Sequence, residues 1–99
     1  MDVSAGDIIV AATDGLFDNV YNEETAVLVS ELRRRGQEPK AAASGVAQFA
    51  RSRAGDPQHP SPFAHGATLA GWPDMHGGKM DDITVLVAYV LPCAPSSGL

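Results

Sequence analysis

The hydrophobic pattern of the chain predicts two short strands, one near each end. Residues Asp7–Thr13 and Ile83–Val90 are both dominated by aliphatic side chains and contain little polar alternation. Continuous apolar runs of this length are typical of strands that are covered on both faces. We therefore predict two strands buried on both sides, each with a polar, glycine-containing stretch at one end.

Apolar residues recur every three or four positions in two segments between these strands, which predicts an inserted antiparallel helix pair. In the first helix, Asn22 is the expected N-cap and Gly36 the expected C′ residue. Its last turn, Arg33–Arg35, is expected to be solvated and to complement the helix dipole. The second helix should begin at Pro39 and run to Arg53, with an alanine-rich face in the core.

The turn after the first strand is expected to be tight. Asp14 leaves the apolar run, and Gly15 can take the positive φ that such a turn often needs. Leu16 and Phe17 should return to the core, and Asn19 should face the polar side. An Asp-Gly pair taken alone is consistent with a simple turn without further chemistry.

A long segment, residues 55–79, separates the second helix from the second strand. It contains four prolines and five glycines, so we predict a mostly irregular loop beside the sheet edge, of the kind that often has a functional role. His59, His65 and His76 lie in this segment. Only the first two approach a zinc-ligand spacing, so all three are expected at the surface.

Four carboxylates lie next to the two apolar runs. Asp14 and Asp18 follow the first run, whereas Asp81 and Asp82 precede the second. If the strands are antiparallel neighbours, the end of one lies beside the start of the other, so these side chains gather at one sheet edge. Carboxylates without nitrogen or sulfur partners suit Mg²⁺ or Mn²⁺. The sequence therefore predicts a candidate metal site, with plain turn and strand-end residues as the alternative.

Composition restricts the function classes. Ninety-nine residues with 44% hydrophobic content make at most one domain, and a net charge of −5 disfavours a nucleic-acid partner. The single Cys93 cannot form an internal disulfide, which points to a reducing compartment.

We find no targeting segment and no apolar run long enough to span a membrane. The abrupt start suggests a fragment, and residues 92–99 are expected to be a disordered tail.

Two stretches together resemble the C-terminal signature motifs of the metal-dependent serine/threonine phosphatases of type 2C. These are Ala12–Asp18, similar to the family's Asp-Gly-hydrophobic-aromatic-Asp turn, and Gly77–Val85, similar to its Asp-(Asn/Asp)-hydrophobic-(Ser/Thr) strand start. Ser61–Ala64 further resembles the organellar branch, which implies a mitochondrial or plastid location. The implied fold class is α/β (α+β): part of the type-2C fold, with residues 1–91 as the C-terminal portion of the catalytic domain.

The resemblance also implies roles for individual residues. Asp14 and Asp81 are similar to ligands of one ion in a binuclear Mg²⁺ or Mn²⁺ centre, and Asp18 to a carboxylate near a third metal. Asp82 and Gly15 would support these ligands rather than bind metal. In the family, a water activated by the metal ions attacks the phosphorus of a phosphoserine or phosphothreonine in a phosphoprotein substrate, without a phosphoenzyme.

The upstream motifs of the family have no counterpart in this sequence. The sequence lacks the family's upstream acidic pair, its upstream Asp-Gly, whose aspartate would bridge two metals, and its phosphate-binding arginine. The isolated chain is therefore expected to be incompetent as a phosphatase, with the missing N-terminal part of the domain as its partner. Two alternatives remain at this point: a non-catalytic regulatory or interaction fragment, and a simple carboxylate metal-binding domain.

Overall fold

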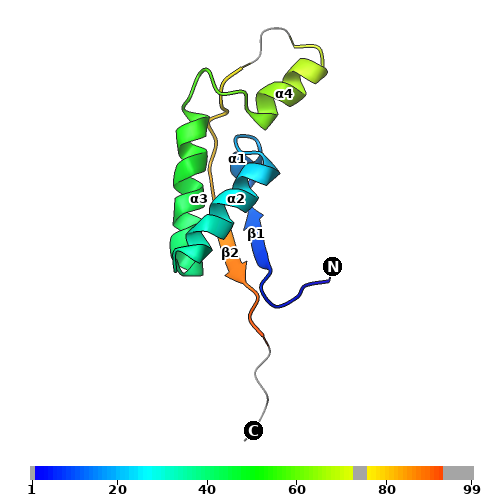
Figure 1. The fold of residues 1–99 in the computed structure, drawn as a ribbon. Coiled ribbons are helices and arrows are strands. Elements are labelled where there is room, and N and C mark those ends of the chain that lie inside the picture. The colour runs from blue at the N-terminus through cyan, green and yellow to red at the C-terminus, as the bar shows by residue number, and fades with distance from the viewer. Residues whose placement is uncertain (1, 73–75, 93–99) are drawn as a thin grey trace, which may run out of the picture.

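A computed structural model describes residues 2–72 and 76–92 and shows a mixed α/β arrangement (Figure 1). The chain order is β1 (Ile8–Ala12), α1 (Asp14–Phe17), α2 (Asn22–Arg34), α3 (Pro39–Ala54), α4 (Pro62–Leu69) and β2 (Val85–Tyr89). The predicted fold class, strand positions and inserted helix pair are confirmed. The expected disordered tail lies, apart from Pro92, outside the described residues.

The two strands pair antiparallel, as the sequence predicts. The register runs from Ile8 opposite Tyr89 to Ala12 opposite Val85. The last residue of β1 is therefore beside the first residue of β2. This pairing brings the two acidic segments, one after β1 and one before β2, to the same edge of the sheet.

The helices cover only one face of this sheet (Figure 1). The covered face pairs Val10 with Val87, and both contact a core that includes the buried Ala42, Val46 and Ala50 of α3. Burial on the opposite face is much lower. The prediction that both strand faces are buried is therefore wrong for this chain, because the described residues supply a layer on one side only.

The uncovered face is nevertheless apolar. Side chains alternate across a strand, so Ile9, Ala11, Leu86 and Ala88 share this face. Ile9 is 36% exposed and Leu86 is 62% exposed. The continuous apolar pattern of the strands is thus explained by two apolar faces, of which one lacks a covering layer among the described residues.

The isolated chain is expected to self-associate through this uncovered sheet face. Burying a leucine side chain stabilises by about 1.5–3 kcal/mol, so Leu86→Thr should weaken association about tenfold or more. Sedimentation velocity at increasing concentration measures the effect. Val27→Thr is the control, because Val27 of α2 is 71% exposed but does not lie on the sheet. Unchanged association of Leu86→Thr would show that another surface is responsible.

The helix pair follows the predicted bounds closely. Gly36 takes φ +83° after the last turn of α2, and α3 begins at Pro39. The N-cap of α2 is Tyr21 instead of the predicted Asn22. The backbone N–H of Tyr21 donates to the Glu24 carboxylate at 3.1 Å. A carboxylate at the third helical position can thus satisfy the backbone at the helix start even without a small polar N-cap.

Only part of the arginine triplet is solvated as expected. Arg34 and Arg35 pair with Glu31 on the surface of α2. These hydrogen bonds hold the pKa of Glu31 below its ordinary value, and the bond from Arg34 has the larger effect. Arg33 instead donates to the carbonyl of Gly6 and lies over the Tyr89 ring, 5.3 Å from its centroid. This arginine therefore connects α2 to both strands at one end of the sheet, where the start of β1 lies beside the end of β2.

The segment predicted as an irregular loop contains a helix, α4. Ser61 is its N-cap, with Oγ accepting from the Ala64 N–H at 3.0 Å, and Pro62 occupies the first helical position. The Ser61 hydroxyl also donates to the carbonyl of Gly77 at 2.8 Å and is fully buried. A single serine thus starts α4 and fixes the chain where it returns towards β2.

Candidate metal centre

Asp14 and Gly15 begin the short helix α1 instead of a turn with positive φ. Asp14 is exposed at its first position. Gly15 is not among the residues with positive φ; a Cβ there would lie 2.3 Å from the carbonyl oxygen of Asp82. The predicted reason for glycine is therefore wrong. This position needs glycine because the backbone before β2 passes directly against α1.

Thr13 joins the same two segments through three hydrogen bonds. Its N–H donates to the carbonyl of Thr84 at 3.1 Å. Its hydroxyl donates to the carbonyl of Asp82 at 3.0 Å and accepts from the Thr84 N–H at 3.1 Å. The residue just before Asp14 is thus bonded to the residues that follow Asp81.

A second glycine allows the returning chain to pass the end of α3. A Cβ on Gly78 would lie 2.1 Å from the carbonyl oxygen of Arg53 and 2.5 Å from the Cα of Ala54. Together with Gly15, this residue lets the acidic segment run in the narrow space between α1 and α3. The path of the chain towards Asp81 is therefore fixed on both sides by backbone.

Asp81 and Asp82 are both exposed, although the backbone of Asp82 packs against Gly15. The Asp81 carboxylate accepts from the Asp82 N–H at 2.8 Å. Both residues line a pocket of about 420 Å³ with Arg51 of α3, and Asp14 is not part of its lining. Within residues 2–72 and 76–92, no group of three or more His, Cys, Asp or Glu side chains is placed to hold a metal ion.

Asp18 does not line this pocket and instead contacts Lys79. The carboxylate lies 3.5 Å from the Lys79 ammonium, and Lys79 also lies over the Phe63 ring, 4.9 Å from its centroid. The side chain of Asp18 is 30% exposed. In this structure its neighbouring cation is therefore a lysine.

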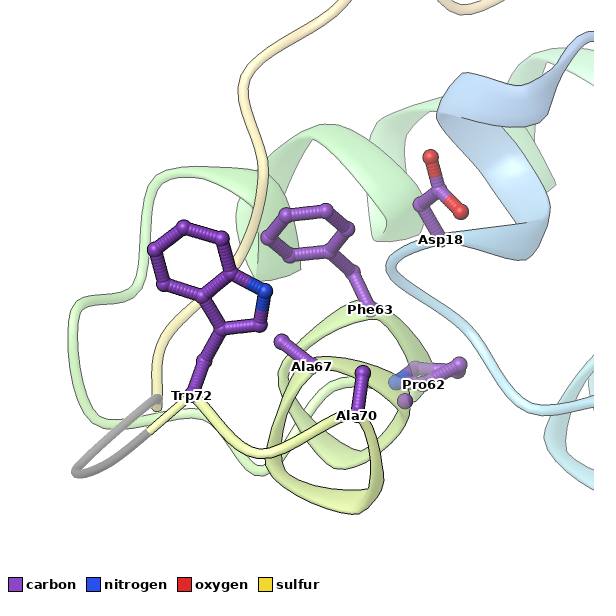
Figure 2. Close-up of a pocket in the computed structure, with 7 residues that line it drawn as sticks. Asp18, Pro62, Phe63, Ala67, Ala70 and Trp72 are labelled. Atoms are coloured by element: carbon purple, nitrogen blue, oxygen red, sulfur yellow. The ribbon is translucent and has the colours of Figure 1, made fainter.

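Beyond Asp18 an apolar groove of about 590 Å³ runs along α4 (Figure 2). Figure 2 shows the rings of Phe63 and Trp72 bordering it, with Ala67 of α4 and Ala70, the residue that follows α4, as small lining residues. The Phe63 N–H donates to the Asp18 carbonyl at 2.9 Å, which ties α4 to the end of α1. Asp18 is thus the charged residue at the border of an otherwise apolar groove.

Asn19 is fully buried, so its predicted polar-side placement is wrong. Its side-chain Nδ2 donates to the carbonyls of Gly15 and Lys79, each at 2.8 Å, and its Oδ1 accepts from the Lys79 N–H at 2.7 Å. All donors and the acceptor of the amide are therefore used. Asn19 binds the Lys79 backbone as a neighbouring strand would.

His59 is also buried, with 3% exposure, whereas His65 and His76 are exposed as predicted. Its Nε2 is 2.9 Å from the carbonyl of Asn19, and its Nδ1 is 3.1 Å from a guanidinium nitrogen of Arg53. A carbonyl can only accept and a guanidinium can only donate, so Nε2 carries the proton. His59 therefore has a structural role, supporting the backbone of Asn19.

Comparisons with known proteins agree with the resemblance in the sequence. The chain is 53% identical to the probable protein phosphatase 2C 80 of Arabidopsis thaliana over 91 residues, covering 91% of this chain and 22% of that protein. It is 42% identical to the protein phosphatase PTC7 homolog of Xenopus laevis, covering 90% of this chain and 30% of the relative. No protein-family model matches.

A solved structure decides the fold. The photosystem II phosphatase PBCP superimposes with a TM-score of 0.79 and 34% identity, covering 91% of this chain and 38% of that one. About nine-tenths of the chain is thus similar to type-2C protein phosphatases. It spans only about a fifth to two-fifths of the length of these relatives, and it corresponds to a C-terminal segment of the phosphatase fold. In the described residues, no helix is long and apolar enough to cross a membrane.

Proposed function

We propose that this chain supplies one side of the metal centre of a Mg²⁺- or Mn²⁺-dependent phosphatase that acts on phosphoserine or phosphothreonine in proteins. The observation that carries the proposal is the antiparallel pairing of β1 and β2, which brings the segments of Asp14 and Asp81 to one sheet edge. Similarity to type-2C phosphatases over about nine-tenths of the chain supports the reaction class.

The residues fit the chemistry of such an ion but provide only part of its ligands. Asp14 and Asp81 offer exposed carboxylate oxygens, which Mg²⁺ and Mn²⁺ prefer. The lack of any three-residue ligand group among the described residues means that the coordination must be completed by other groups. When bound, the ion would neutralise phosphoryl oxygens and activate a water for attack.

The other proposed site residues act around these two ligands. Asp82 and Gly15 would hold the ligand segments together, since the Asp82 carbonyl lies against Gly15. Asp18 would contribute to a weaker, third cation site. In that role its carboxylate must exchange the Lys79 ammonium for a metal ion. A side chain paired to a lysine at the surface can make this exchange at little cost, because exposed ion pairs are worth about 0–1 kcal/mol.

The remaining part of the catalytic domain is the proposed partner of the uncovered sheet face. Ile9 and Leu86 would be buried by it, and it would supply the upstream carboxylates that complete the metal centre. The relatives are several times longer than the matched segment, which supports such a partner. We further propose a mitochondrial or plastid location for the whole protein, based on the organellar resemblance of Ser61–Ala64.

A chimaera tests the proposal. Replacing the corresponding segment of the Arabidopsis relative, 53% identical over 91 residues, with this chain should give Mn²⁺-dependent hydrolysis of a phosphothreonine peptide. The rate should fall within about tenfold of the parent enzyme, a difference of about 1.4 kcal/mol in transition-state stabilisation. The 99-residue chain assayed alone should show no turnover, because residues 2–72 and 76–92 contain no group of three or more metal ligands.

The same assay separates the proposal from its main alternative. A chimaera that melts at the same temperature as the active parent but does not release phosphate would contradict the phosphatase role. That result would favour a non-catalytic regulatory fragment. Turnover by the isolated chain would instead contradict the conclusion that other groups must complete the centre.

A further inference from the structure

Two polar side chains, Asn19 and Thr13, bind the backbone on either side of Asp81. Asn19 bonds both the N–H and the carbonyl of Lys79, two residues before Asp81. The Thr13 hydroxyl bonds the carbonyl of Asp82 and the N–H of Thr84, which lie one and three residues after Asp81. The segment that carries Asp81 is therefore held at both ends by residues that lie next to Asp14 and Asp18 in sequence.

We propose that Asn19 and Thr13 are positioning residues of the metal centre, which hold Asp81 at a fixed position relative to Asp14. The inference rests on the proposed function, since it assumes that both carboxylates bind one cation. Neither residue was among the predicted site residues. Neither touches the metal in this proposal; each acts through the backbone of the ligand segment.

Asn19 is suited to this role because both N–H groups and the oxygen of its amide have partners. Its two N–H groups reach Gly15 in α1 and Lys79 in the returning chain, and its oxygen accepts from Lys79. Aspartate would present oxygen to both carbonyls, and leucine would leave them unpaired. A buried unpaired carbonyl is costly, so the segment would move to reach water and Asp81 would move with it.

A second layer holds Asn19 itself. The Nε2–H of His59 donates to the carbonyl of Asn19, and Arg53 donates to Nδ1 of the same imidazole. Arg53 in turn lies 3.5 Å from the carboxylate of Glu24 in α2. The position of Asn19 is therefore set by α2, α3 and the segment that leads to α4, not by α1 alone.

Two matched pairs of variants test the inference through Mn²⁺ affinity, measured from the free-ion signal in electron paramagnetic resonance. Thr13→Val keeps the shape of the side chain but removes its hydroxyl, whereas Thr13→Ser keeps the hydroxyl. We expect Thr13→Val to weaken Mn²⁺ binding about tenfold and Thr13→Ser to leave it close to the wild-type value, because the loss of a partner that orients a ligand typically costs 10- to 100-fold.

The second pair separates positioning from stability. Asn19→Ala should weaken Mn²⁺ binding by about tenfold or more. Val46→Ala, at a fully buried α3 position without bonds to the ligand segments, should lower the unfolding temperature but leave the affinity of the folded protein unchanged. If Asn19→Ala does not fold, the Thr13 pair still decides, since Thr13 is exposed and its substitution leaves no cavity.

Asp14→Asn in the same titration distinguishes the two levels of the proposal. If Asp14→Asn removes Mn²⁺ binding while Thr13→Val and Asn19→Ala retain wild-type affinity, the positioning role is wrong and the metal site stands. If Asp14→Asn also retains wild-type affinity, the proposed metal centre itself is wrong. Equal losses in Asn19→Ala and Val46→Ala would show that Asn19 acts only through stability.

Discussion

Replacing Gly15 with alanine is expected to lower the free energy of unfolding by at least about 3 kcal/mol, at the upper end of the usual cost of overpacking. The new Cβ would lie 2.3 Å from the Asp82 carbonyl oxygen and 2.9 Å from Cγ1 of Ile83. The first neighbour is backbone, so it cannot move by a rotamer change. Relief requires α1 to separate from the segment before β2, which also breaks the hydrogen bonds of Thr13.

Urea unfolding followed by circular dichroism measures this loss. Gly66→Ala is the matched control, because Gly66 lies inside α4 with no atom within 4 Å of an added Cβ. Alanine is favoured over glycine in a helix by about 1 kcal/mol, so this control should be neutral or stabilising. Equal stability of the two variants would show that α1 and the acidic segment do not approach each other as closely as described.

The helix pair and the strand pairing could be predicted because they depend on repeating patterns. Apolar spacing defines the faces of α2 and α3, and the opposite order of strand and carboxylate at the two ends indicates which edge the acidic segments share. Burial of both strand faces could not be predicted correctly in the same way. Apolar residues such as Ile9 and Leu86 indicate that a layer must cover this face of the sheet. They do not indicate whether these 99 residues contain that layer.

The missed elements have a different physical origin. Helix α4 was hidden by prolines that usually interrupt structure, although Ser61 followed by Pro62 is also a normal helix start. Asn19 and His59 are buried because backbone groups 60 and 40 residues away satisfy them. No local pattern predicts such long-range partners. The metal role of the candidate carboxylates stays a prediction from the sequence, whereas the residues proposed to position them were found only from coordinates.

Replacing either proposed ligand, in Asp14→Asn or Asp81→Asn, is expected to weaken Mn²⁺ binding by about 100-fold or more. The loss should exceed the roughly 10- to 100-fold cost of removing a residue that only orients a ligand, because a charged oxygen is removed from the ion itself. Asparagine keeps the size of the side chain and both positions are exposed, so the fold should remain intact. Titration of the free-ion resonance signal, with circular dichroism of each variant, separates affinity from folding.

Asp2→Asn is the control for this pair, because it makes the same change in net charge at an exposed position before β1, away from the proposed metal edge. If diffuse attraction to an acidic chain caused Mn²⁺ binding, all three variants would lose affinity equally, and added salt would weaken Mn²⁺ binding in all of them. A site built from two paired strands predicts a large loss in Asp14→Asn and Asp81→Asn and little in Asp2→Asn. The double variant should then lose little more than either single one, since two residues that bind the same ion are not additive.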